Sequence, residues 1–163
     1  MFVAFLLLMV AVPVDAFEDE LLERLTGDWV MRGTIAGQEI VHDLQVEWIL
    51  AHHYLQISEI ARERDADGNP AYEALVLIGQ DEATGSYACL WLDITGGEGL
   101  TNGVIGVAQR DGDAIPFVFD TGDATAIHNT FSYDRAVDRW RWRIDNVRDG
   151  EPRRFADVTL RRE

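Results

Sequence analysis

Leu25-Thr26-Gly27-Asp28-Trp29 is the stretch of sequence that decides the fold. A Gly-x-Trp that opens a long series of short alternating segments is typical of the first strand of a small antiparallel β-barrel. The glycine allows the backbone to bend close to the floor of such a barrel. The indole then fills that end with a large apolar area. The stretch therefore predicts that a barrel begins near Gly27.

From Gly27 onward the hydrophobic pattern has a period of two residues. Leu44, Val46 and Trp48, for example, alternate with acidic and amide side chains. Strands with this pattern bury one face and expose the other. Turn signals rich in Gly, Asp and Asn separate the segments. Ten strands are predicted, at residues 28–35, 39–49, 53–63, 71–79, 86–94, 100–110, 114–120, 124–133, 139–147 and 153–161.

This strand order predicts an all-β fold, an antiparallel up-and-down β-barrel of about ten strands. Closing such a sheet into a barrel removes its free edges. A β-sandwich of the immunoglobulin kind is the main alternative, but it usually needs Greek-key crossovers. Residues 17–25 predict a short amphipathic helix in front of the barrel.

The first 16 residues, MFVAFLLLMVAVPVDA, have the pattern of a secretory signal peptide. The apolar run from Phe2 to Val12 is shorter than the roughly 20 residues that a membrane span needs. A buried N-terminal strand is the alternative, but the run lacks the period-two pattern of the other strands. We therefore expect a periplasmic or secreted protein, cleaved near Ala16, with no stable membrane insertion and with residues 17–163 forming one barrel domain.

The charge of the chain argues against one class of partner. The chain has 29 acidic and 14 basic residues, and its formal net charge is −15. Every basic residue is an arginine. Binding to a phosphate backbone needs clustered cations. The composition therefore predicts no nucleic-acid partner, and it leaves the oligomeric state open.

Cys89 is the single cysteine, so no internal disulfide can form. A chain of this length buries roughly 68–70% of its unfolded surface and needs no such bridge. An exported domain of this kind is more typical of the bacterial periplasm than of small animal secreted scaffolds. We expect Cys89 to be a core residue, because no His or Asn constellation accompanies it.

Further motifs follow the opening Gly-x-Trp at regular distances. They are Trp48-Ile49-Leu50, Gly79-Gln80-Asp81, Tyr87, and Trp91 with Asp93. With them the chain resembles a calycin-like bacterial family of largely unknown function, related to the lipocalins and fatty-acid-binding proteins. Gln80 stands where that family tends to have Tyr. The resemblance implies a barrel with an apolar cup and brings no established activity.

The resemblance also implies a structural lock at the end of the chain. In lipocalins the opening Trp is often capped by an Arg from the last strand, in a cation–π contact. Arg161 and Arg162 stand where such a partner of Trp29 would be.

Two histidines are candidates for a polar group inside the cup. His42 shares its strand parity with the apolar residues of segment 39–49, and His128 shares its parity with two alanines. Either could orient a ligand head group or ligate a haem iron. The alternative is a histidine at the rim or one hydrogen-bonded within the fold. His52 and His53 stand at a turn and are expected to be solvated.

No cofactor and no metal are predicted. Nitrobindin, a ten-stranded haem-binding barrel, is similar in architecture, and that resemblance implies an axial histidine near the C-terminus. No histidine follows His128 in this chain. Asp65-Ala66-Asp67-Gly68-Asn69 is similar to a calcium loop, but its glycine is fourth where an EF-hand needs it sixth. A hairpin turn is the preferred interpretation of this segment.

Aromatic residues spread over several strands favour a ligand cavity, because ten strands enclose a wider lumen than side chains fill easily. Core filling is the alternative. The expected ligand-binding residues are His42, Leu44, Val46, Trp48, Tyr72, Trp91, Asp93, Phe117, His128, Trp140 and Trp142.

The predicted function is the binding of a small apolar or lipid-like molecule, oriented by His42, Asp93 or His128. Burial of apolar area, at about 25 cal/mol per Å², would drive it. A barrel enzyme, an isomerase or hydrolase of a lipid-like substrate, is the alternative. No catalytic residue is assigned, because no nucleophile, metal or nucleotide motif is present. A filled barrel that works through its acidic surface or as a dimer is a third possibility.

Overall fold

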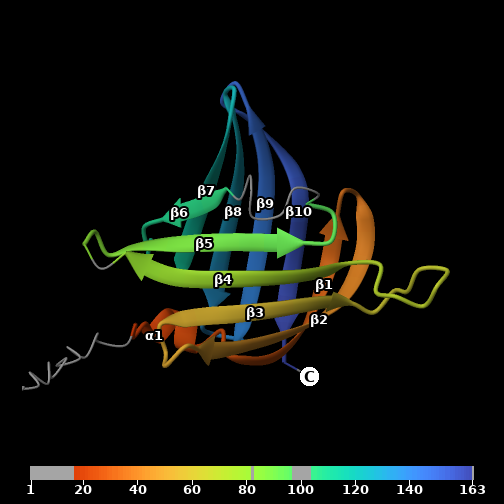
Figure 1. Cartoon of the computed structure of the whole chain (residues 1–163), viewed down its shortest axis with the longest axis horizontal. Coiled ribbons are helices and arrows are strands. Elements are labelled where there is room, and N and C mark those ends of the chain that lie inside the picture. Colours follow the sequence, from red (N-terminus) through yellow and green to blue (C-terminus); the bar gives the residue numbers. More distant parts are fainter. Residues whose placement is uncertain (1–16, 82, 97–103, 163) are drawn as a thin grey trace, which may run out of the picture.

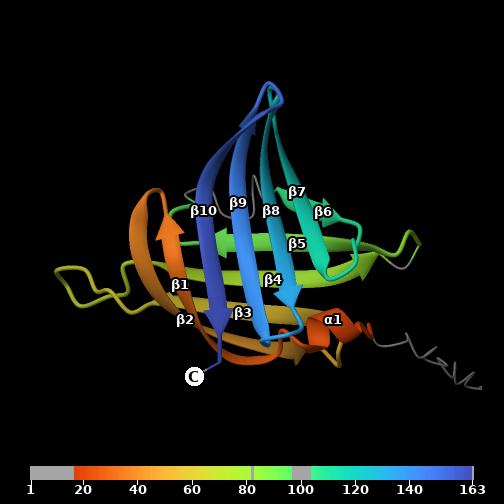
Figure 2. The ribbon, with the colours of Figure 1, turned by 180° about the vertical axis from the view of Figure 1, so that it is seen from behind.

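The strands that the sequence predicts close into one barrel (Figures 1 and 2). The computed structural model describes residues 17–81, 83–96 and 104–162, and the expected signal peptide at residues 1–16 lies outside them. The elements are α1 Glu20–Glu23, β1 Gly27–Ile35, β2 Gln38–Ile49, β3 Tyr54–Ala61, β4 Glu73–Asp81, β5 Ser86–Asp93, β6 Ile105–Ala108, β7 Ala114–Gly122, β8 Thr125–Asp134, β9 Arg139–Arg148 and β10 Glu151–Arg161.

Each strand pairs antiparallel with its sequence neighbour, and β1 pairs with β10. The predicted all-β, up-and-down barrel is therefore confirmed. In Figure 1, β7 to β10 stand upright behind β3 to β5, and α1 lies at the lower end of the barrel. The hairpins β7–β8 and β9–β10 project at the opposite end. The two ends of the barrel thus differ, one being covered by the helix.

Some boundaries differ from those predicted. β6 begins at Ile105 within the predicted segment 100–110, of which residues 100–103 lie outside the described ones. β4 begins two residues late and leaves Tyr72 in the preceding loop, where its carbonyl accepts the N–H of Ala61 at 2.9 Å. The helix is shorter than residues 17–25, and the part of the chain described here has no helix long and apolar enough to cross a membrane.

Buried side chains fill the end of the barrel next to α1. Leu25 is fully buried after the helix, and the indole N–H of Trp29 donates to its carbonyl oxygen at 2.7 Å. The indole N–H of Trp140 donates to the carbonyl of Arg24 at 3.4 Å. Each indole buries about 200 Å² of surface. At about 25 cal/mol per Å² of buried apolar area, this contributes at most roughly 5 kcal/mol of transfer free energy. These two residues form the floor of the barrel.

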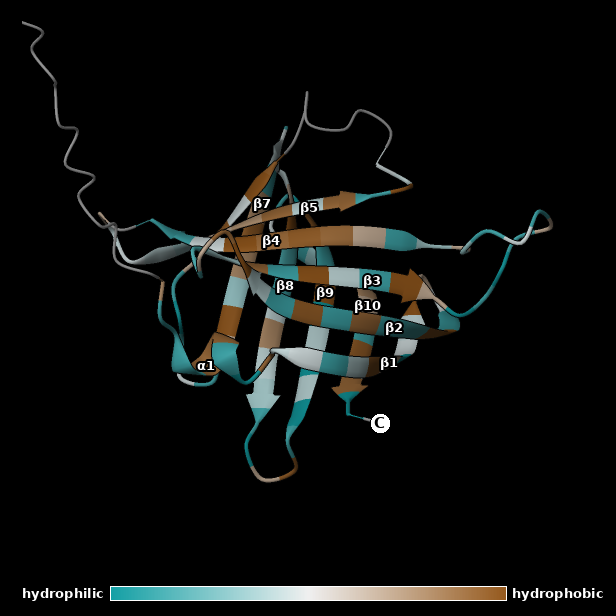
Figure 3. Cartoon of the chain, turned by 60° about the horizontal axis from the view of Figure 1, so that its bottom comes forward, coloured by the Kyte–Doolittle hydropathy of each residue, from teal (hydrophilic) through white to brown (hydrophobic). Residues whose placement is uncertain are grey.

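Two strands are apolar on both faces, unlike the half-polar pattern of the others. Figure 3 shows hydrophobic colouring along most of β4 and parts of β5. On their outer faces Leu77 lies opposite Leu90, and Leu90 lies opposite Ile105, which is 48% exposed. The outer face of β9 and β10 is instead polar, with Arg141 paired to Asp157 at 2.5 Å. The outer wall is therefore divided into an apolar and a charged side.

Closure between β1 and β10 depends on a glycine. A Cβ at Gly33 would lie 2.3 Å from the carbonyl oxygen of Asp157 and 2.7 Å from the Cα of Val158. Any side chain there would push the last strand away, so the close approach of the two strands requires glycine. Gly27 has a positive φ of 105°, which also favours glycine, and its Cβ would lie 2.7 Å from a guanidinium nitrogen at the flexible end of the Arg162 side chain.

Arg162 locks the same seam from the end of the chain. Its guanidinium carbon lies 3.9 Å from the ring centroid of Trp29. It also donates to the carbonyl oxygens of Thr26 and Arg24, at 3.0 and 3.2 Å, and pairs with Asp138 at 3.0 Å. Of the two arginines expected to cap the opening Trp, the structure thus uses Arg162.

We predict that Arg162→Ala lowers the free energy of unfolding by about 1–2 kcal/mol, because the indole face and two carbonyls lose a cationic partner. Urea unfolding measures the change. Arg161→Ala is the matched control, because Arg161 is exposed and its substitution removes the same charge without affecting the contact with the Trp29 ring. Equal losses in the two variants would show that the lock has no stabilising role.

Candidate functional site

A group of polar side chains lies inside the barrel, on the walls formed by β2 to β5. We call it the His42 cluster, and it consists of His42, Glu59, Tyr72, Trp91 and Asp93. The strand register explains why they meet. Glu59 lies opposite Ala74, and Ala74 lies opposite Asp93, so their side chains share the inner face.

His42 and Glu59 form a buried pair at the centre of the cluster. The His42 Nδ1 and Glu59 Oε1 atoms are 2.5 Å apart, and the two residues are 5% and 1% exposed. A carboxylate that accepts the Nδ1 proton fixes the orientation of the imidazole. In the neutral ring Nε2 is then left as a lone-pair acceptor.

Tyr72 connects this pair to β5. Its ring stacks on the imidazole of His42, with centroids 5.5 Å apart. The hydroxyl donates to Asp93 Oδ2 at 3.3 Å and accepts from the indole N–H of Trp91 at 3.2 Å. Burial raises the pKa of the Tyr72 hydroxyl well above its usual range, and the negative charge of Glu59 adds to the shift. Tyr72 therefore stays a neutral hydrogen-bond donor.

Three buried polar atoms have no hydrogen-bond partner among the described residues. They are Glu59 Oε2, Asn129 Oδ1 and Trp142 Nε1. Buried polar groups are nearly always paired, and leaving one unpaired costs about 1–3 kcal/mol. Each such atom therefore needs a physical explanation.

The unpaired atoms on β8 and β9 belong to the same interior as the cluster. Asn129 is 2% exposed and lies opposite Phe117, whose ring is also buried. The ring of Trp142 meets that of Trp91 edge-on at 6.2 Å and stacks on Phe131 at 4.3 Å. Trp91 thus links the aromatic wall of β7 to β9 with the polar cluster opposite.

The structure brings together some of the residues expected to bind a ligand. His42, Tyr72, Trp91 and Asp93 meet in one cluster. Four others are buried on the inner wall: Leu44, Val46, Phe117 and Trp142. These four residues therefore lie in the same interior as the cluster.

Two expected site residues lie instead at the helix end. Trp140 is part of the floor. The indole N–H of Trp48 donates to Glu23 Oε2 at 2.7 Å, and its ring stacks on His52 at 4.2 Å. His52 was expected to be solvated, but the neighbouring indole covers one face of its ring.

The prediction that His128 faces the cup is wrong. His128 is exposed on the outer face of β8, and its neighbour Asn129 takes the inward position. The inner face of this strand carries the bulky residues Phe131 and Tyr133, because burying these rings removes more apolar surface from water than burying alanine does. The small residues that share the parity of His128 lie outside.

Two site residues were missed, Glu59 and Asn129. Each occupies an inward position between apolar residues of its strand, as Glu59 does between Ile57 and Ala61. The signal that could have found them is a polar residue at a position of the two-residue repeat that is otherwise occupied by apolar residues. Cys89, expected in the core, is fully buried, and burial raises the pKa of its thiol, so it is no candidate nucleophile.

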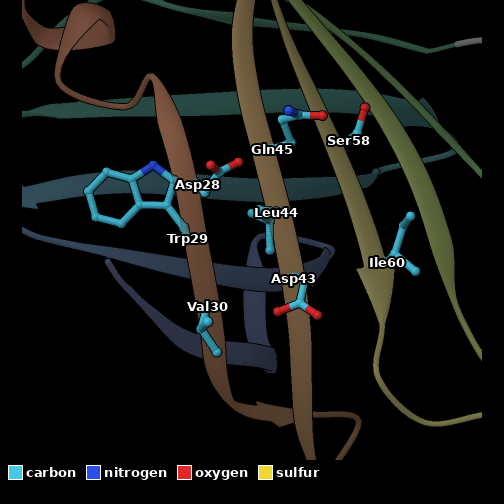
Figure 4. A pocket seen from close by; sticks show the side chains of 8 residues that line it. All are labelled: Asp28, Trp29, Val30, Asp43, Leu44, Gln45, Ser58 and Ile60. Carbon is cyan, nitrogen blue, oxygen red and sulfur yellow. The ribbon is translucent and has the colours of Figure 1, made fainter. Parts of the chain in front are cut away.

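A hollow of about 400 Å³ on the outer wall of β1 to β3 is a competing site (Figure 4). Asp43 lines it but is already held by Arg62, with oxygen–nitrogen distances of 2.6–3.0 Å, and this pairing lowers the pKa of Asp43. Figure 4 shows Trp29 pointing away from the other lining side chains. None of the unpaired buried atoms lines this hollow, so the interior is the stronger candidate.

A second open hollow, of about 720 Å³, lies at the free ends of β7 to β10 and is lined by Ile127, Asn146, Arg148 and Arg153 among others. No group of three or more His, Cys, Asp or Glu side chains in the described ranges could hold a metal ion.

Comparison with known proteins gives the fold. No family model matches the chain, and no curated protein matches it by sequence. Solved structures do match. One is described as the crystal structure of Rv2717c from M. tuberculosis, with a TM-score of 0.60 and 17% sequence identity over 91% of this chain and 99% of that one. At this identity the likeness shows a shared barrel fold alone.

We predict that Tyr72→Phe makes stability less sensitive to alkali. Because the pKa of Tyr72 is higher in the folded protein than in the unfolded chain, the unfolded chain loses the hydroxyl proton at a lower pH than the folded protein does. The contribution of Tyr72 to the free energy of unfolding is therefore complete below about pH 10 and is lost as the pH rises above it. Without the hydroxyl, the free energy of unfolding should fall less steeply above about pH 10, by up to about 1.4 kcal/mol per pH unit. Urea unfolding at a series of pH values measures the slope, and identical slopes would refute the assignment.

Proposed function

We propose that the protein binds a small, mostly apolar molecule inside the barrel, with the His42 cluster orienting its polar end. The three unpaired buried atoms, Glu59 Oε2, Asn129 Oδ1 and Trp142 Nε1, carry this proposal. A fold that keeps three unpaired polar groups in its interior sacrifices stability, and such sacrifices are typical of functional sites. A bound molecule that pairs with them would recover that stability.

The walls around these atoms supply the apolar contact. The buried rings of Phe117 and Trp142 each contact the ring of Phe131, which is also buried. Trp91 meets Trp142 from the opposite wall. A ligand that buries about 300 Å² of apolar surface there gains about 7 kcal/mol. Taken alone this gain corresponds to a dissociation constant of roughly 10 μM, and the costs of association weaken it, so the polar contacts must supply part of the affinity.

The calycin-like resemblance and the export of the protein are part of the same proposal. The opening Leu25–Trp29 motif and the Arg162 contact over the Trp29 ring support the resemblance. The sequence pattern of residues 1–16 supports a cleaved signal peptide and a periplasmic or secreted location.

A barrel enzyme acting on a lipid-like substrate is the second candidate, and the His42–Glu59 pair favours it. A carboxylate that holds a histidine by Nδ1 leaves Nε2 free to take a proton from a bound molecule. The partner of His42 is Glu59, whereas Asp93 accepts from the hydroxyl of Tyr72. Conversion of the bound molecule during incubation would distinguish the enzyme from the binding protein.

Uptake of the neutral dye N-phenyl-1-naphthylamine tests the binding proposal. We expect a saturable, one-to-one rise in dye emission with energy transfer from tryptophan. Ala74→Leu should weaken this uptake at least tenfold, because the added side chain enters the inner face between Glu59 and Asp93.

Ala88→Leu is the matched control, since the same substitution lies on the outer face of β5 and should leave uptake unchanged. Circular dichroism checks that both variants fold. The proposal fails if the wild type takes up no dye. It fails equally if Ala74→Leu binds as the wild type does, because the dye would then sit outside the barrel.

A further inference from the structure

We infer that the interior site selects a ligand with a hydrogen-bond-donating polar end, an alcohol or an amine, and discriminates against carboxylates. This inference rests on the proposed function, and it names the chemical class of the ligand.

The unpaired atoms set the hydrogen-bonding preference. Two of them, Glu59 Oε2 and Asn129 Oδ1, are acceptors, and only Trp142 Nε1 is a donor. A hydroxyl group both donates and accepts, and an ammonium group donates up to three hydrogen bonds. A carboxylate only accepts, so at the His42 cluster it would meet the unpaired acceptor Glu59 Oε2, and at the opposite wall it could pair with Trp142 Nε1 but not with Asn129 Oδ1.

The charges of the interior favour the same class. The buried polar and charged residues of the described chain are His42, Glu59 and Asn129, and no arginine is among them. Asp93 adds a second carboxylate next to Tyr72. A ligand carboxylate would bring a like charge to a water-poor site and lose its hydration there. An ammonium group would meet an opposite charge.

The hydrogen-bond donors seen within the cluster are engaged by other members of the cluster. The Nδ1 proton of His42 is engaged by Glu59, and the hydroxyl proton of Tyr72 is engaged by Asp93. The indole N–H of Trp91 is engaged by Tyr72. These three donors of the cluster are therefore already in use.

Three probes with one eight-carbon chain test the inference: 1-octanol, octylamine and octanoate. We expect isothermal titration calorimetry at pH 7 to give dissociation constants at least tenfold lower for the alcohol and the amine than for octanoate. The shared chain keeps the apolar contribution constant, so that the ratio reports the head group alone.

Glu59→Gln should reduce the preference for octylamine over octanoate at least tenfold, because the amide is neutral and adds a donor in place of an acceptor. Glu47→Gln is the matched control. It removes the same charge from the exposed outer face of β2 and should leave the ratio unchanged. If Glu59→Gln fails to fold, the wild-type ratio decides the question by itself.

Octanoate that binds as tightly as octanol or octylamine would overturn the inference. Dye uptake without binding of any eight-carbon probe would overturn it as well, while leaving the proposed function in place. Failure of the dye and of all three probes to bind would overturn the proposed function itself.

Discussion

The closure of β1 against β10 is the constraint on which every interior position depends. Gly33 lets the two strands approach, and Arg162 holds the seam by covering the Trp29 ring at 3.9 Å. A closed barrel has no free edge and a fixed inside. Because side chains alternate along each strand, every second residue then points into the lumen, and His42 and Glu59 are among these residues.

Closure also gives the barrel two unlike ends. The α1 end has a floor of buried indoles whose N–H groups bond to backbone carbonyls. Farther along the barrel, the interior holds the His42 cluster on one wall and the unpaired Asn129 and Trp142 atoms on the other. The paired indoles serve stability, whereas the unpaired groups reduce it. That difference is the physical reason for placing function in this part of the barrel.

Much of the fold could be predicted from the sequence, because period-two alternation and turn residues are local signals. The expectation of an Arg lock also came from the chain, through its resemblance to lipocalins. The site was only partly predictable. Parity grouped His42 with Leu44, Val46 and Trp48, but it could not show that Glu59 is the partner of His42, since cross-strand contacts depend on register. His128 was misplaced because parity does not reveal which face of a strand is inside. In β8 the bulky residues decide it.

The central claim is that the barrel holds a small molecule, and native mass spectrometry of protein purified without detergent or organic solvent tests it most directly. The account predicts that the folded protein carries a small molecule that is released on denaturation, or that it takes up one equivalent of 1-octanol when added. Identical masses before and after denaturation, with no uptake of octanol or of octylamine, would contradict it.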